Sequence, residues 1–229
     1  MIVILANCSS SNYNTLMVKA EKKFYAENDP LGASRELISH VNKKNQDQLL
    51  FMMEAGYLLH LAGKYEKSNE ILLAADKKAE QMYKSVTKEI AASITNETGK
   101  DYMGEDYERI LLNMTLGINF LALKDYESAQ VEFKKVNSKL DAIREKSGLD
   151  YNLNLMALYL SAVAHEATGE YDYAYVDLKK IHDTSPGYHF VGEKLISLAR
   201  IMDYQDDLAS WKKKYPGVGA KDKAAGKPV

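Results

Sequence analysis

The chain has 229 residues, of which 46% are hydrophobic and 27% are charged, and its formal net charge is −2. This length suits one domain or two small ones, and the near balance of charge gives no electrostatic reason to expect nucleic acid as a ligand. No apolar run approaches the roughly 18 residues that a membrane-spanning helix needs. With only 4 Pro and 13 Gly, and with Ala, Leu, Lys, Glu and Met at helical spacing, the sequence predicts an all-α fold.

The chain opens with "MIVILANCSSSNYN", which contains its single cysteine. Leu5-Ala6-Asn7-Cys8 resembles the box that precedes the acylated cysteine of a bacterial lipoprotein, although the apolar run before it is shorter than the roughly 7–15 residues of a signal. A start codon further upstream would supply the missing leader. We therefore expect residues 1–8 to be a truncated lipoprotein signal with the lipid on Cys8, and residues 9–13 to be a linker. The alternative is a frayed, partly buried start of the fold.

Three stretches of the chain share one helix–turn–helix pattern: Glu54–Ala75, Thr115–Val136 and Leu160–Ile181. Each has a small residue in its first helix, a charged residue and a tyrosine after the turn, and a small then a large apolar residue in its second helix. Two helices approach to about 8–9 Å only where the contacting side chains are small. The residues expected to pack between helices are Gly56, Gly117, Ala129, Phe133, Ala162 and Ala174.

This pattern resembles the tetratricopeptide repeat (TPR), which implies an α-solenoid of stacked helix pairs. The repeats here are further apart than in a regular array, so long insertions are expected between them. The first insertion predicts an extended helix and then a loop from about Thr98 to Asp106, and the second predicts a helix that ends at Gly148. We expect the solenoid to span residues 14–216 and a disordered basic tail to span residues 217–229.

The first helix of each repeat is apolar nearly all round, so it is either buried on every side or faces an apolar ligand. In a solenoid of this type these helices line the concave surface. The side chains expected in that groove are Met53, Tyr57, Met114, Ile118, Met156 and Tyr159. The groove would hold an apolar peptide, a partner helix or a lipid-like molecule. The alternative is that the protein's own inserted segment or terminal helix fills it, because methionine-rich stripes are more often core.

The polar stretch "TGKDYMGEDYE" is a second candidate binding surface, because long loops in repeat proteins often lie on one binding face. Its predicted partner-binding residues are Tyr102, Gly104, Glu105, Asp106 and Tyr107. The alternative is a helix start, with the glycine in the turn and the acidic residues favoured by the helix dipole.

Signals of catalysis are weak. "HEATG" begins like the zinc-binding helix of a protease, but Gly169 stands where the second histidine should be, and the five histidines have no ligand-like spacing. Glu54, Glu105 and Glu166 are conceivable general acids in a sugar-binding groove, yet no pair of carboxylates has the spacing of a catalytic pair. We therefore expect no enzymatic activity, no metal and no cofactor.

The stretch "DYMGEDYERILLNMTLGINFLALKDYESAQVEFKKVN" resembles the signature of an uncharacterised group of bacterial lipoproteins with TPR-like repeats. The matching residues are Tyr102, Gly104, Glu105, Asp106, Asp125, Tyr126 and Ala129. The resemblance covers roughly residues 98–215 and implies an envelope lipoprotein. We expect a periplasm-facing outer-membrane lipoprotein, held in the bilayer through Cys8, that acts as a non-enzymatic scaffold or assembly factor for another envelope protein. The alternative is a carrier that binds a small apolar ligand or lipid in the concave groove.

Overall fold

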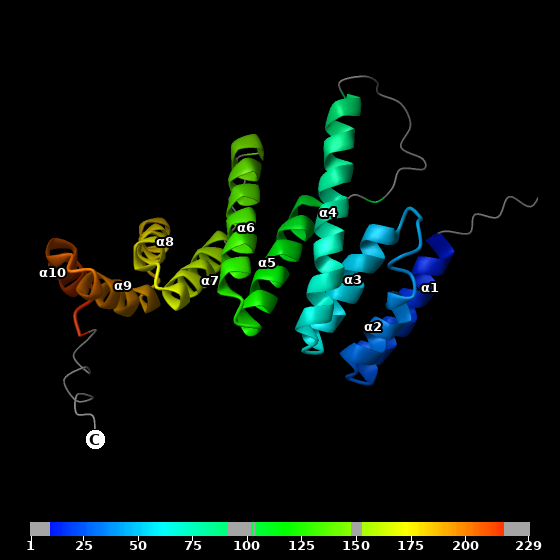
Figure 1. Cartoon of the computed structure of the whole chain (residues 1–229), viewed down its shortest axis with the longest axis horizontal. Coiled ribbons are helices and arrows are strands. Elements are labelled where there is room, and N and C mark those ends of the chain that lie inside the picture. The colour runs from blue at the N-terminus through cyan, green and yellow to red at the C-terminus, as the bar shows by residue number, and fades with distance from the viewer. Residues whose placement is uncertain (1–9, 91–101, 103, 148–152, 218–229) are drawn as a thin grey trace, which may run out of the picture. The chain divides into compact units, whose positions relative to one another are not determined.

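The computed structural model describes residues 10–90, 102, 104–147 and 153–217, and these form helices and turns without a strand (Figure 1). The all-α prediction is therefore confirmed. The chain divides into two compact units, Met1–Asp125 and Tyr126–Val229. In the first unit the helices are α1 (Ser10–Glu21), the π-helical turn η1 (Lys22–Ala26), α2 (Pro30–Ile38), α3 (Gln48–Leu61), α4 (Tyr65–Ile90) and α5 (Asp106–Ala122). In the second unit they are α6 (Tyr126–Ser147), α7 (Leu153–Thr168), α8 (Tyr171–Thr184), α9 (Phe190–Ile201) and α10 (Gln205–Lys214).

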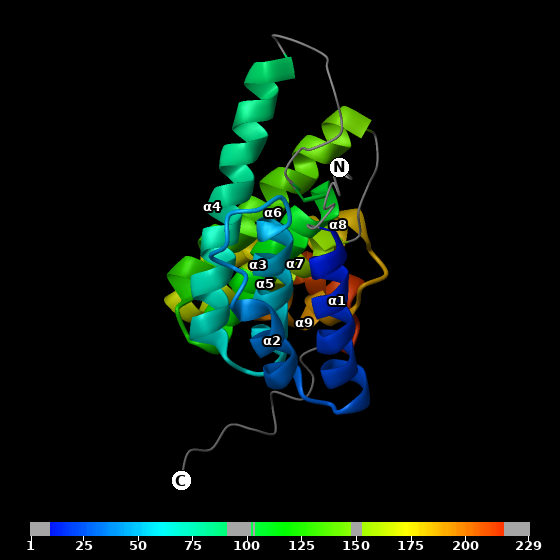
Figure 2. The same ribbon diagram turned by 90° about the vertical axis from the view of Figure 1, so that its right-hand side faces the viewer.

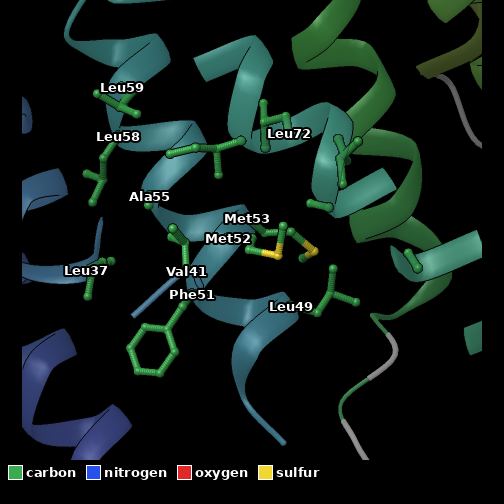
Figure 3. Close-up of a cluster of buried hydrophobic side chains, with 14 of the residues drawn as sticks. Leu37, Val41, Leu49, Phe51, Met52, Met53, Ala55, Leu58, Leu59 and Leu72 are labelled. Carbon is green, nitrogen blue, oxygen red and sulfur yellow. The ribbon is translucent and has the colours of Figure 1, made fainter. Parts of the chain in front are cut away.

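The core of the first unit is centred on α3, which packs against both α2 and α4. In Figure 3 the side chains of Leu37 on α2 and Leu72 on α4 lie on opposite sides of α3. Both side chains are fully buried, and Phe51 on α3 is 2% exposed. The apolar residues around α3 are therefore explained by burial on several sides, as expected for a helix without a polar face.

A glycine and a serine allow α3 and α4 to approach closely. A Cβ atom at Gly56 would lie 2.4 Å from Cδ2 of Leu72, so no larger side chain fits there. The Ser68 hydroxyl donates a hydrogen bond to the Gly56 carbonyl oxygen at 2.8 Å. The buried amide of Asn119 on α5 then donates to the Ser68 hydroxyl at 2.8 Å and to the Asn69 side-chain oxygen at 2.9 Å. This polar network ties α3, α4 and α5 together.

The extended helix predicted after the first repeat is α4, which runs well past the ends of α3 and α5 (Figures 1 and 2). The guanidinium of Arg109 on α5 binds the Glu80 carboxylate on α4 with an N–O distance of 2.8 Å. It also lies 4.5 Å from the centroid of the Tyr83 ring. A cation held by a carboxylate and an aromatic face fixes the position of α5 on this long helix.

In the second unit each helix packs against the next, from α6 through to α10. The fully buried Ala162 and Ala174 lie where α7 meets α8. Near the C-terminal end, a Cβ atom at Gly192 would lie 2.5 Å from Cγ of Tyr215. Trp211 is 4% exposed, and its indole nitrogen donates to the Tyr175 hydroxyl at 2.7 Å.

Several predicted boundaries differ from the structure or lie outside it. Helix α1 begins at Ser10, so the predicted linker over residues 9–13 is largely helical. Residues 1–9, which include Cys8, lie outside the described residues, as do residues 218–229 of the predicted tail. Helix α5 begins at Asp106, where a loop was predicted to end. None of the described helices is both long and apolar enough to cross a bilayer.

Candidate interaction grooves

The second unit carries an open groove between α7 and α9, which we call the α7–α9 groove. Its volume is about 550 Å³. The lining residues are Tyr159, Glu166, Tyr171, Phe190, Glu193, Lys194, Ser197, Leu198 and Ile201. Both helices are first helices of their pairs, and Tyr171 at the start of the intervening helix α8 also lines the groove.

Aromatic side chains form one end of the α7–α9 groove. The Phe190 ring contacts the Tyr159 ring edge to face, with 5.3 Å between centroids, and the Tyr188 ring in the same manner at 5.4 Å. Phe190 nevertheless remains 51% exposed. Aromatic rings that are held by each other and still face solvent are typical anchors for a protein partner, because little conformational entropy is lost when they bind.

An ion pair crosses the same groove. The Lys194 ammonium group on α9 lies 2.7 Å from both carboxylate oxygens of Glu166 on α7. Glu193 and Ser197 are exposed beside it. The groove thus combines an aromatic surface with fixed polar groups, which suits a peptide of mixed polarity better than a lipid chain.

The structure places the predicted concave residues in two different environments. Tyr159 lines the α7–α9 groove and Met156 is 51% exposed on α7. Met53 and Met114, in contrast, are 2% and 3% exposed. These two methionines fill the interior and do not line an open groove, because α3 and α5 are covered on more faces than an amphipathic surface helix. Ile118 is partly buried.

The predicted partner-binding stretch mainly builds the start of α5. The Tyr102 hydroxyl donates to the Glu108 carboxylate, and its backbone nitrogen donates to the Gln46 carbonyl oxygen at 2.9 Å. The same carboxylate accepts from the Glu105 backbone nitrogen at 2.8 Å, which completes a capping box. Gly104 has a φ of 78°, a turn conformation that favours glycine.

Tyr102, Gly104 and Glu105 therefore help to build the start of α5, and some of the predicted residues are also accessible. Glu105 and Asp106 are exposed at the helix start, and Tyr107 is 58% exposed. The carbonyl oxygen of Glu108 also accepts a hydrogen bond from the Tyr57 hydroxyl at 3.3 Å, which connects the stretch to α3.

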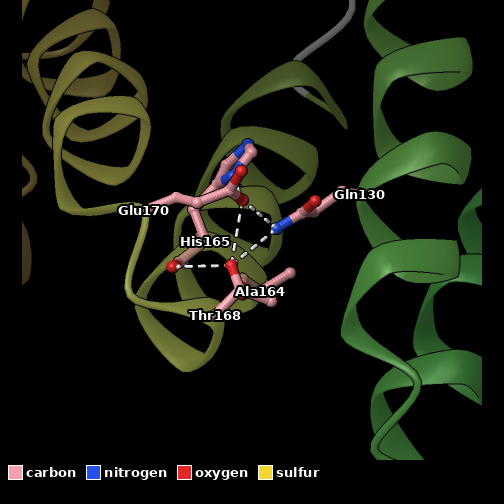
Figure 4. Close-up of polar contacts among 5 residues, drawn as sticks. All are labelled: Gln130, Ala164, His165, Thr168 and Glu170. Atoms are coloured by element: carbon pink, nitrogen blue, oxygen red, sulfur yellow. Dashed lines mark hydrogen bonds and ion pairs between the residues drawn. The ribbon is translucent and has the colours of Figure 1, made fainter.

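His165 belongs to a polar network at the end of α7, not to a zinc-binding arrangement (Figure 4). Its Nδ1 atom lies 2.9 Å from the Glu170 carboxylate, which also accepts from the Gln130 amide at 2.7 Å and the Thr168 hydroxyl at 2.9 Å. These three hydrogen bonds lower the pKa of Glu170. Within the described part of the chain, no three His, Cys, Asp or Glu side chains are grouped so that they could hold a metal ion.

The first unit has a second groove, which lies beside α3 and which we call the α1–α3 groove. Its volume is about 310 Å³. The lining residues are Met17, Ala20, Glu21, Phe24, Tyr25, Glu54, Tyr57, Leu58 and Leu61. Of these, Tyr57 was predicted as a groove residue, and Glu54 was considered as a general acid in a groove. The other lining residues were not predicted, because the segment before Pro30 mixes its apolar and aromatic residues with lysines and glutamates.

These helix pairs, with small residues at their contacts and grooves between their first helices, define an all-α protein of TPR-like helical repeats. No model of a known protein family matches the sequence, and no curated protein matches it closely enough to be a relative.

Solved structures share the fold at low sequence identity. MamA from Desulfovibrio magneticus RS-1 superposes with a TM-score of 0.57 at 12% identity, over 94% of this chain and 98% of that one. The TPR-like repeats of a putative kinesin light chain from Podosopora anserina give 0.57 at 12% identity, over 95% and 100%. The apo form of RapI gives 0.61 at 14% identity, over 93% of this chain and 55% of that one. This likeness establishes the fold alone.

Proposed function

We propose that this protein is a non-enzymatic scaffold that binds another protein through the α7–α9 groove. The observation that carries this proposal is the exposed Phe190, which is oriented by two other aromatic rings beside a fixed Glu166–Lys194 ion pair. An exposed anchor in a pre-formed groove binds without a large ordering cost. A rim of charged side chains then gives the partner a defined register.

The proposed location is the periplasmic side of a bacterial outer membrane, with the chain anchored by an acylated Cys8. This part of the proposal is supported by the lipoprotein-like box around the cysteine and by the similarity of residues 98–215 to envelope lipoproteins. One acyl chain gives only marginal membrane binding, so a stable anchor requires more than one. The proposed partner is another protein of the cell envelope.

A lipid carrier is less well supported. Two of the methionines expected to line a lipid-binding groove, Met53 and Met114, are buried. The α7–α9 groove is open and holds a lysine and two glutamates among its lining residues. A groove for an acyl chain would instead be enclosed and predominantly apolar.

The proposal is tested by placing a photo-reactive phenylalanine analogue at position 190 in cells that normally make the protein. The matched control places the same analogue at Val131 on α6, which is also about half exposed (54%) but does not line the groove. We expect one protein to be crosslinked at position 190 and not at position 131. Equal crosslinking at both positions would contradict a role for the groove.

A further inference from the structure

The α1–α3 groove differs from the first groove in its charge. We propose that it docks a basic amphipathic segment of a protein partner, and that a lysine or arginine of that segment pairs with Glu54. This inference rests on the proposed function, since it names the chemistry of a partner segment for the scaffold.

The walls of the α1–α3 groove are apolar and accessible. Tyr25 is 79% exposed and Leu61 is 57% exposed, although both border a groove with Phe24 and Leu58 in its wall. Large apolar side chains that surround a concavity and remain in water mark a binding surface more often than isolated surface residues do. The apolar face of an amphipathic helix or extended peptide would cover them.

A rare backbone conformation builds one wall of this groove. Helix α1 continues into the π-helical turn η1, and Phe24 and Tyr25 both belong to that turn. Their rings contact each other edge to face, with 4.8 Å between centroids. The turn ends before Asn28, which has a φ of 50°. Because π-helical turns occur mostly as single turns, often at functional sites, the geometry here is consistent with a wall shaped for a ligand.

The lining of the groove includes two carboxylates without a cation. Glu21 and Glu54 both line it, and neither side chain has a hydrogen bond or ion pair with any residue that the structure describes. Burial, together with the charges of Glu108 and Glu21, raises the pKa of Glu54. The nearby Lys23 is directed to Glu27 at 3.8 Å. The groove is therefore negatively charged at the partly buried Glu54 and at the exposed Glu21.

The negative charge at Glu54 favours a positively charged ligand over a negatively charged one. A fatty acid, a nucleic acid or an acidic peptide would bring further negative charge to Glu54, which is already unfavourable beside Glu21 and Glu108. A lysine or arginine would instead supply the missing counter-charge inside a partly desolvated site, where charge-assisted hydrogen bonds are strong. The apolar walls require that the rest of the segment be amphipathic.

The inference is tested with a short synthetic helix of leucine and lysine and with its leucine–glutamate counterpart, both labelled with a fluorophore. Fluorescence anisotropy measures their affinity for the full chain and for two variants. Glu54→Gln removes the groove charge while keeping the side-chain shape. Glu66→Gln, at an exposed position in the first turn of α4, removes the same charge outside the groove.

We expect the lysine peptide to bind the wild-type chain and the Glu66→Gln variant equally, and to bind Glu54→Gln roughly tenfold more weakly, as for one charge-assisted hydrogen bond. The glutamate peptide should not bind. Equal binding of the lysine peptide to both variants, or equal binding of the two peptides, would overturn the inference. Crosslinking at Phe190 is unaffected by that result, because it tests the other groove, so failure of the inference is separable from failure of the proposed function.

Discussion

At the scale of single residues, Glu54 is a group whose ionisation opposes folding. Folding raises the pKa of the Glu54 carboxyl. The protonated carboxyl therefore contributes its full stability below the ordinary pKa of 4.5, and this contribution is lost as the pH rises through the pKa of Glu54 in the folded chain. We therefore expect Glu54→Gln to raise the thermal midpoint at pH 7, with the difference disappearing in acid.

Thermal unfolding of Glu54→Gln across the pH range, beside Glu66→Gln, measures this effect. A lower midpoint for Glu54→Gln at pH 7 would show that the carboxylate has a stabilising partner, and would contradict a Glu54 without a cation in the folded chain. Gains in stability that accompany losses in binding are characteristic of functional positions.

A second residue-scale prediction concerns the contact between α3 and α4. Gly56→Ala places a methyl group within 2.5 Å of two carbon atoms of the buried Leu72. Although alanine favours the helix by up to about 1 kcal/mol, overpacking should leave the variant destabilised by about 1–3 kcal/mol. Urea unfolding measures the change. The matched control is Gly187→Ala, which meets no atom within 4 Å and should be nearly neutral.

The sequence predicted which small residues pack between helices better than it predicted which side chains are exposed. Gly56 was predicted as a contact residue from the local repeat pattern, and it lies against Leu72 of the next helix. Exposure of Met53 could not be predicted in the same way, because it depends on helices α2, α4 and α5, which pack around α3 from other parts of the sequence. Asn119 was missed because nothing local indicates that a lone asparagine in an apolar helix will serve a buried network.

At the scale of elements, the attachment of α10 to the second unit depends on a buried histidine. The ring of His182 on α8 contacts Trp211 edge to face, with centroids 4.9 Å apart, and its Nδ1 atom is hydrogen-bonded to the Tyr215 hydroxyl at 2.5 Å. Burial, and then the charge of Lys214, lowers the pKa of His182. The unfolded chain therefore takes up a proton at a higher pH than the folded one.

We predict that the second unit loses stability as the pH falls below about 6.5, the ordinary pKa of histidine. Trp211 is the only tryptophan of the chain, so its fluorescence during urea unfolding reports on this element. His182→Gln, which cannot be protonated, should flatten the dependence between pH 7 and pH 5. An unchanged slope in the variant would contradict the assignment.

Helical elements were largely predictable, whereas their ends and their grooves were not. The helices could be predicted from apolar residues at helical spacing and from the tyrosines that follow the turns. The proline at the start of α2 is a further local signal of a helix start. The π-helical turn η1 has no known local signature in "KKFYA", and no sequence pattern singled out Phe190 at the start of α9 as an aromatic anchor. Both features arise where helices meet, so a single sequence predicts them poorly.

At the scale of the whole molecule, the location of the protein depends on Cys8, which lies outside the described residues. Expression in bacteria of the gene with its upstream codons should yield a mature chain that begins at an acylated Cys8. Intact-mass spectrometry measures this directly, and Cys8→Ser is the control that cannot be acylated. An unmodified mature chain would contradict the proposed anchor. It would not bear on the proposed scaffold role, which is tested by crosslinking at position 190.

A protein partner in the α7–α9 groove should depend on the Phe190 ring for its affinity. The measurement is the dissociation constant of the partner crosslinked at position 190, determined for the wild-type chain, Phe190→Ala and Val131→Ala. We predict that Phe190→Ala weakens binding by at least about 2 kcal/mol, as expected for a central aromatic anchor, and that Val131→Ala has no effect. Equal affinities for all three chains would contradict the claim.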